Sequence, residues 1–208
     1  ANTITVNTPP VAQFTAGTAC AGGTIAINNT SSPVAGSIWA WNFGNGTTST
    51  LQNPSVTYST AGSYNVSLLV TASNGCTAIA NVPVTINPLP VASFNAPATV
   101  CQGSVTPLIN TSGPGLGTIT SYAWNFGNGQ TSVASNPTVT YTNPGNYTIT
   151  LTITNSFGCT ATATRSIAVN PTPIASAGER SAFARSGRRV LQRVFLESTI
   201  IVHYLVKW

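Results

Sequence analysis

Few side chains in the body of this sequence could do chemistry. Residues 1–177 contain no Asp, Glu, Lys or His, and Arg165 is their only charged side chain. General acid–base catalysis and a Ser/His/Asp arrangement both need such groups, so the sequence predicts that this part of the chain is not an enzyme. The same lack of charge predicts that it does not bind nucleic acid, which is recognised through basic side chains. The candidates that remain are four cysteines and a large number of amide and hydroxyl side chains.

Two segments of the chain are copies of one another. The hexapeptide Trp-Asn-Phe-Gly-Asn-Gly occurs at residues 41–46 and again at 124–129, which is an offset of 83 residues. The offset stays constant as far as an Asn-Pro pair that closes each copy. A unit of this length is a domain and is longer than the repeats of solenoids. The twelve motif residues are Trp41, Asn42, Phe43, Gly44, Asn45, Gly46, Trp124, Asn125, Phe126, Gly127, Asn128 and Gly129.

The cysteines follow the duplication, with one pair in each copy. Four cysteines allow three pairings, and the repetition favours the two bridges that lie within the copies, Cys20 with Cys76 and Cys101 with Cys159. No His, carboxylate or Cys-x-x-Cys accompanies them to suggest a metal site. Bridges of this kind are typical of an oxidising compartment, so the sequence predicts an extracellular or cell-surface protein.

Short alternating segments predict an all-β fold. Tyr147, Ile149, Leu151 and Ile153 are expected to face a core, and the threonines between them are expected to face solvent. Asn-Gly pairs supply the positive φ values of tight turns, and no helical periodicity is present in the copies. The pattern predicts two stacked antiparallel sheets in each copy.

The repeated hexapeptide and the Tyr and Gly-x-Tyr that follow it resemble the PKD domain, whose signature is Trp-Asp-Phe-Gly-Asp-Gly. The resemblance covers about residues 9 to 171 and implies tandem immunoglobulin-like (PKD-type) β-sandwiches. It departs from the family where asparagines replace both aspartates. Calcium sites are usually built from carboxylates. We therefore expect these asparagines to be turn residues, and we expect the repeats to bind no metal or cofactor.

The conserved spacing of the aromatic residues predicts that Trp41, Trp124 and the tyrosines after them form the core and its corners. Trp39, beside Trp41 in its strand, and its counterpart Tyr122 are expected to face outward. They are therefore the candidates for stacking on a sugar, although packing at the sheet edge also accounts for them.

The expected domains are repeat one at residues 9–88 and repeat two at 89–171. Residues 1–8 resemble the closing strand of a preceding repeat, and 172–177 resemble the start of a third, so the chain reads as a segment of a longer array. From residue 178 to 208 the composition turns basic and apolar. Residues 188–195 could form a short helix, and Thr199 to Trp208 are expected to form an apolar strand. This apolar run is too short and too interrupted to span a bilayer. The tail could be foreign or frame-shifted sequence, an anchoring or assembly segment, or a membrane-surface helix.

The PKD resemblance implies extracellular spacer and adhesion modules, found in surface adhesins and beside the catalytic domains of secreted proteases and chitinases. The form with paired cysteines resembles repeats of Bacteroidota-type surface proteins. An uncharged surface lets copies approach at little electrostatic cost. The sequence therefore predicts a structural or adhesive repeat module of a stalk, fibre or filament, with partners that are copies of itself, neighbouring repeats, surface polysaccharide or another cell-surface protein. The alternative is a carbohydrate-binding accessory module of a secreted hydrolase.

Overall fold

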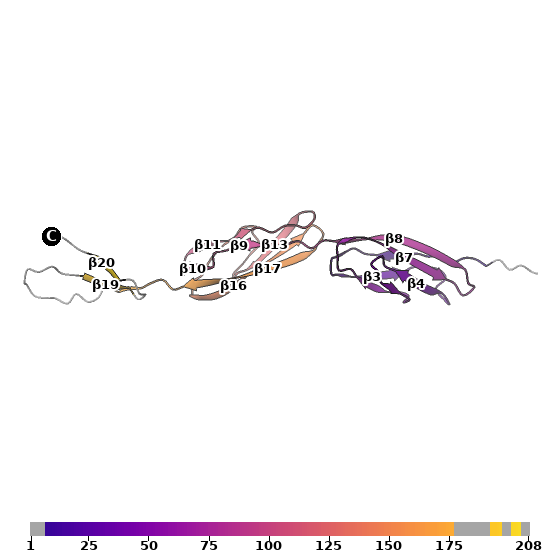
Figure 1. Ribbon diagram of the computed structural model, residues 1–208, viewed down its shortest axis with the longest axis horizontal. Helices are drawn as coiled ribbons and strands as arrows, with labels where there is room; N and C mark the ends of the chain where they lie inside the picture. Colours follow the sequence, from indigo (N-terminus) through magenta and orange to yellow (C-terminus); the bar gives the residue numbers. More distant parts are fainter. Residues whose placement is uncertain (1–6, 177–191, 197–200, 205–208) are drawn as a thin grey trace, which may run out of the picture.

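The structure, a computed structural model, describes residues 7–176, 192–196 and 201–204. Residues 7–170 form two β-sandwiches that follow one another end to end, with the short segment after β8 as the connection (Figure 1). The all-β prediction with two tandem sandwiches is confirmed. Among the described residues, no helix has the length and apolar character needed to cross a membrane.

Repeat one packs a five-stranded sheet against a three-stranded one. The larger sheet has the order β2-β8-β7-β4-β5, and the smaller has the order β1-β3-β6. All neighbouring strands are antiparallel except β2, which pairs in parallel with the end of β8. The bounds are β1 Phe14–Ala16, β2 Ala19–Cys20, β3 Thr24–Asn29, β4 Ile38–Asn42, β5 Thr48–Ser49, β6 Ser55–Thr57, β7 Gly62–Thr71 and β8 Thr77–Asn87.

Repeat two has the same five-stranded sheet, in the order β10-β17-β16-β13-β14. Its second sheet is divided into the pairs β11-β15 and β12-β9. The division lies at Pro107, which stands where repeat one has Ala26 and which has no backbone N–H to give to a ladder. The bounds are β9 Phe94–Asn95, β10 Thr99–Cys101, β11 Val105–Pro107, β12 Ile109–Asn110, β13 Ile119–Asn125, β14 Thr131–Ser132, β15 Thr138–Thr140, β16 Gly145–Asn155 and β17 Thr160–Asn170.

Each sandwich has its own core. The long strand β16 buries Ile149, Leu151 and Ile153 completely, and its threonines lie on the outer face, as the alternation predicts. In repeat one the corresponding strand β7 buries Val66, Leu68 and Val70. Because the two clusters of buried residues are separate, each repeat holds the hydrophobic surface it needs to fold as a unit.

The tail contributes two strands to a small antiparallel sheet. β19 (Gln192–Leu196) pairs with β18 (Ala175–Ser176) on one side and with β20 (Ile201–Tyr204) on the other. The expectation of a helix over 188–195 is therefore wrong for residues 192–195, where strand pairing satisfies the backbone. The strand expected in the last ten residues is found at 201–204. Residues 177–191, 197–200 and 205–208 lie outside the described part of the chain.

Candidate functional site

The four asparagines of the hexapeptides build turns. Asn42 Oδ1 accepts the Gly44 N–H at 2.9 Å, and Asn45 Oδ1 accepts both the N–H and the hydroxyl of Thr47, at 3.0 and 2.6 Å. The second copy repeats this geometry: Asn125 Oδ1 accepts the Gly127 N–H at 2.9 Å, and Asn128 Oδ1 accepts the Gln130 N–H at 3.0 Å. The oxygens that a cation would need therefore already accept hydrogen bonds from the turn.

An amide also does something here that a carboxylate cannot. Asn45 Nδ2 donates to the Thr57 carbonyl at 3.3 Å, and Asn128 Nδ2 donates to the Thr140 carbonyl at 3.5 Å. Both bonds are long, and both tie the turn to the end of a strand in the opposite sheet. An ionised aspartate has no proton to donate at this place, so Asn45 and Asn128 make a bond that an aspartate could not make, whereas Asn42 and Asn125 only accept.

The glycine between the asparagines is required by a close approach. Gly44 has φ +73°, and a Cβ built on it would lie 2.8 Å from the Asn65 carbonyl oxygen. Gly127 has φ +77°, and its Cβ would lie 2.7 Å from the Thr148 carbonyl oxygen. The turn therefore packs directly on the backbone of the long central strand, where no side chain fits.

The tryptophan and the first tyrosine of each copy are buried in the core, as predicted, and each donates a hydrogen bond to a backbone carbonyl. Trp41 is 2% exposed, stacks edge-on against Phe14 and donates its indole N–H to the Leu51 carbonyl at 2.8 Å. Tyr58 donates its buried hydroxyl to the Phe43 carbonyl at 2.9 Å. Burial raises the pKa of Tyr58 above its ordinary value, and neighbouring Tyr64 raises it further. Repeat two makes the equivalent bonds through Trp124 and Tyr141, at 2.9 and 3.0 Å.

The candidates for sugar stacking do not face outward. Residues two apart in a strand share a face, so Trp39 lies on the same side as Trp41, with Ala40 on the opposite side. Trp39 packs against the core of repeat one, and its indole nitrogen is buried without a hydrogen-bond partner. Tyr122 packs against the core of repeat two in the same way. The expected outward orientation was an error of strand parity.

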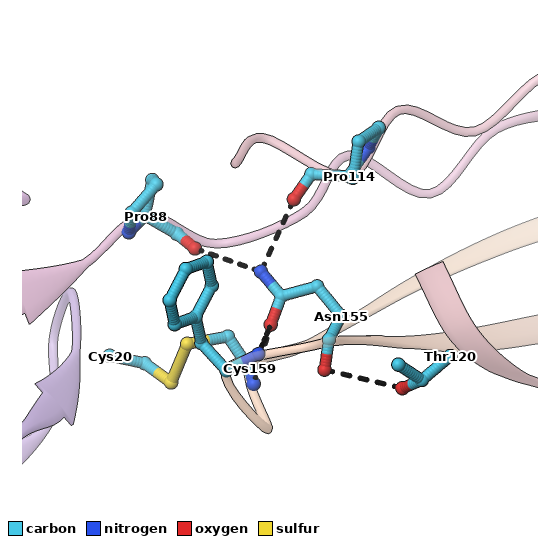
Figure 2. Close-up of a disulfide and its surroundings, with 7 residues drawn as sticks. Cys20, Pro88, Pro114, Thr120, Asn155 and Cys159 are labelled. Carbon is cyan, nitrogen blue, oxygen red and sulfur yellow. Dashed lines mark hydrogen bonds between the residues drawn. A yellow bond between two sulfur atoms is a disulfide. The ribbon is translucent and has the colours of Figure 1, made fainter. Parts of the chain in front are cut away.

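The disulfide in the described structure joins the two repeats. Cys20 of repeat one is bonded to Cys159 of repeat two across a Cα–Cα distance of 5.7 Å (Figure 2). Cys76 and Cys101 are free. The predicted pairs Cys20–Cys76 and Cys101–Cys159 are therefore wrong.

Strand geometry explains the correction. Cys20 lies opposite Asn87 at the end of β8, whereas Cys76 immediately precedes Thr77 at its start. β8 has 11 residues, and at roughly 3.3 Å per residue it separates these cysteines by about 36 Å. A disulfide needs Cα atoms within about 7 Å, so the two ends of one sandwich cannot be bridged. The end at which the chain leaves a sandwich is called its far end, and the opposite end is called its near end. The far end of repeat one can be bridged to the near end of repeat two, because these two ends meet at the junction.

Asn155 lies beside Cys159 and forms hydrogen bonds at the same junction. It is 1% exposed, and its Nδ2 donates to the carbonyls of Pro88, at 3.3 Å, and Pro114, at 3.2 Å (Figure 2). Its Oδ1 accepts the backbone N–H groups of Phe157 and Cys159, at 3.1 and 3.0 Å. A single amide thus ties the connecting segment, a loop and the hairpin turn that carries the bonded cysteine.

Sequence reasoning missed Asn155 because its counterpart in repeat one is Ala72. The disulfide, in contrast, had a usable signal in the positions of the cysteines. Cys76 precedes the closing strand of repeat one, and Cys20 pairs with the other end of that strand. Counting the 11 residues of that strand would have excluded the bridge within a repeat.

The family model described as "PKD domain" matches residues 7–86 and 87–169. The chain belongs to the PKD domain family. PKD domains are non-catalytic modules that occur in extracellular proteins, including a protease.

The matches to Vibrio proteins are no longer than about one repeat. The chain is 43% identical over 65 residues to the pre-pro-metalloprotease PrtV of Vibrio cholerae, and this match covers 31% of the chain and 7% of that protein. The PKD1 domain of Vibrio anguillarum Epp is 40% identical, with 41% of this chain and 99% of that one covered and a TM-score of 0.38. The PKD1 domain of PrtV is 41% identical over 39% of this chain and 98% of that one, with a TM-score of 0.36. The chain thus corresponds to a small part of its curated relatives.

The outer sheet faces of the PKD repeats are neutral and differ in character. On repeat two, Thr150 pairs with Thr164 and Thr152 with Thr162 across β16 and β17, and the hydroxyls of the second pair lie 3.1 Å apart. A shallow depression of about 510 Å³ lies beside them, lined by residues of β13, β14 and β16. On repeat one, Leu69 and Ile79 pair at the equivalent place and are 37% and 66% exposed. The described residues hold no group of three His, Cys, Asp or Glu side chains that could bind a metal.

Proposed function

We propose that this chain is a segment of a non-enzymatic, extracellular structural and adhesive array, in which successive PKD repeats form a stiff stalk or filament. The observation that carries the proposal is the Cys20–Cys159 bridge across the junction between the repeats. Domains joined by a short linker move relative to one another by default. At this junction the disulfide opposes that motion, and so does the hydrogen bond from Asn155 to the short connecting segment.

Three other properties support an extracellular structural role. A disulfide persists in oxidising compartments. Residues 1–177 carry one charged side chain, so the body of the chain has almost no groups whose ionisation would respond to ambient pH or salt. Exposed strand edges are usually protected by Lys or Pro, whereas here β5 and β14 end their sheets with Thr and Ser.

The neutral sheet faces favour lateral packing between copies as the adhesive step. Ile38, Leu69 and Ile79 are exposed together on the outer face of repeat one, and desolvating apolar groups without charges carries little electrostatic cost. The proposal makes no use of an aromatic sugar platform, because Trp39 and Tyr122 pack against the cores.

Small-angle X-ray scattering of the oxidised full chain tests the stalk. We expect a narrow distribution of inter-repeat distances, because the bridge and Asn155 fix the junction. The double variant Cys20→Ala/Cys159→Ala should broaden that distribution. The matched control is Cys76→Ala/Cys101→Ala, which removes the free thiols and should leave the scattering unchanged. If the oxidised chain is as flexible as the variant without the bridge, the stalk proposal is wrong.

A further inference from the structure

Two cysteines remain free, and each occupies a place that is bonded in the other repeat. Cys101 is the counterpart of Cys20 at the far end of a sandwich, and Cys76 is the counterpart of Cys159 at the near end. The pair of repeats therefore carries one bridge in its middle and one thiol at each outer end.

The backbone around Cys101 reproduces that around Cys20. Cys20 lies opposite Asn87 in a parallel pair, and Cys101 lies opposite Asn170. The N–H of the following residue donates to the carbonyl of that asparagine in both repeats, at 2.9 Å in repeat one and 2.8 Å in repeat two. Cys101 is exposed at the end of repeat two, in the place from which Cys20 reaches across a junction.

The backbone around Cys76 likewise reproduces that around Cys159. In each hairpin the cysteine carbonyl accepts an N–H at 2.9 Å, from Ala72 in repeat one and from Asn155 in repeat two. The N–H of each cysteine donates to an asparagine Oδ1 at 3.0 Å, that of Asn74 for Cys76 and that of Asn155 for Cys159. The two turns therefore present their cysteines alike.

The near end of repeat one also holds its incoming chain as repeat two does. Asn74 Nδ2 donates to the Thr8 carbonyl at 3.2 Å, and Asn155 Nδ2 donates to the Pro88 carbonyl at 3.3 Å. Thr8 precedes the Pro-Val-Ala segment of repeat one as Pro88 precedes that of repeat two, and the residues 3–7 before it resemble the closing strand at 84–87. The same kind of junction is thus prepared on both sides of a repeat.

We propose that every junction between such PKD repeats is closed by one disulfide. Where another repeat precedes, Cys76 bonds to the cysteine in its Cys20 position, and where another repeat follows, Cys101 bonds to the cysteine in its Cys159 position. This inference rests on the proposed repeat array and adds its covalent connection. Each bridge forms by thiol–disulfide exchange: two protein thiols give their two electrons and two protons to a disulfide oxidant such as oxidised glutathione, which becomes two thiols.

A lengthened chain tests the inference. A second copy of residues 88–170 is inserted directly after Asn170, so that the Asn-Pro sequence of the natural junction is kept, and the protein is refolded in a glutathione redox buffer. Hydroxylamine then cleaves the Asn-Gly bonds without reducing disulfides. In this chain Cys76 and Cys101 lie on one fragment, the original Cys159 on the next and the inserted copy of Cys159 on the last.

We expect the fragment with Cys101 to be joined to the last fragment, and the fragment with Cys20 to be joined to the one with the original Cys159. Two thiols then stay free, Cys76 and the inserted copy of Cys101. With Cys159→Ala in the inserted copy alone, we expect three free thiols and no new bridge. If Cys101 stays alkylatable beside an intact repeat, or bonds between chains, the inference is overturned. The Cys20–Cys159 bridge serves as the folding control. The stalk proposal is tested separately by small-angle X-ray scattering, so either proposal can fail without the other.

Discussion

Removing one hydroxyl from the corner of repeat one should destabilise that repeat measurably. In Tyr58→Phe the Phe43 carbonyl loses the donor that lies 2.9 Å away, in a place where Tyr58 is 1% exposed. A net hydrogen bond contributes about 1 kcal/mol, and leaving a buried partner unsatisfied costs about 1–3 kcal/mol. We expect a loss of about 2 kcal/mol in the free energy of unfolding of repeat one, or roughly 10 °C in Tm for a unit of this size.

Two other substitutions complete this experiment. Tyr64→Phe removes a hydroxyl that donates to the exposed Thr60 carbonyl at 3.0 Å, where water can replace it, so we expect a loss below about 0.5 kcal/mol. Tyr141→Phe removes the equivalent 3.0 Å bond in repeat two and should cost as much as Tyr58→Phe. Hydrogen exchange of the β7 and β16 amides reports the two repeats separately.

The same tyrosine predicts the response to alkali. Burial, and secondarily Tyr64, raise the folded-state pKa of Tyr58 above its ordinary value of 10.0. The stabilisation is therefore fully present below about pH 10 and is lost as the pH rises through the folded-state pKa. Tyr58→Phe should remove repeat one's share of this alkaline loss. The reasoning is refuted if Tyr58→Phe and Tyr64→Phe destabilise equally, or if the alkaline loss is unchanged in Tyr58→Phe.

Three further outcomes are expected. Asn155→Ala should destabilise repeat two by about 1–3 kcal/mol and loosen the junction, because two carbonyls lose their donor; in scattering and thermal unfolding, Thr154→Ala on the outer face is the control and should change little. Calcium or a chelator should leave Tm unchanged, because the oxygens of Asn45 and Asn128 already accept bonds from the turn; a rise of several degrees would point to a cation site. Self-association of residues 1–177 should be nearly independent of ionic strength in sedimentation, and a strictly monomeric truncated chain at high concentration would contradict lateral packing.

The sequence was sufficient for the fold because its signals are local. Strict alternation in β16 and the Asn-Gly turns specify which side of each strand is buried, and the structure agrees at Ile149, Leu151 and Ile153. The duplication then required two copies of one sandwich. Trp39 shows how narrow such an argument is, because an error of one residue in strand parity moves a side chain from the core to the surface.

The junction could not be predicted in the same way because it depends on contacts between repeats. Repetition pairs the two cysteines of each copy, but in repeat one the 11-residue strand β8 places Cys20 and Cys76 at opposite ends of the sandwich. Asn155 aligns with Ala72, so the duplication does not single it out, and its role follows from where Pro88 and Pro114 lie in space. In the tail, residues 192–195 of the expected helix lie in β19, because β18 and β20 are available to pair with them.

Fragment mapping of the natural chain tests the central claim, which is that a disulfide joins the two PKD repeats. Cleavage at the Asn-Gly bonds gives fragments 1–45, 46–74, 75–128 and 129–208, with Cys76 and Cys101 together on 75–128. If Cys20 is bonded to Cys159, non-reducing mass spectrometry finds 1–45 joined to 129–208, while 75–128 is alone and carries two alkylated thiols. If the bridges lie within the repeats, 75–128 is joined to both 1–45 and 129–208, and that three-fragment species would contradict the account.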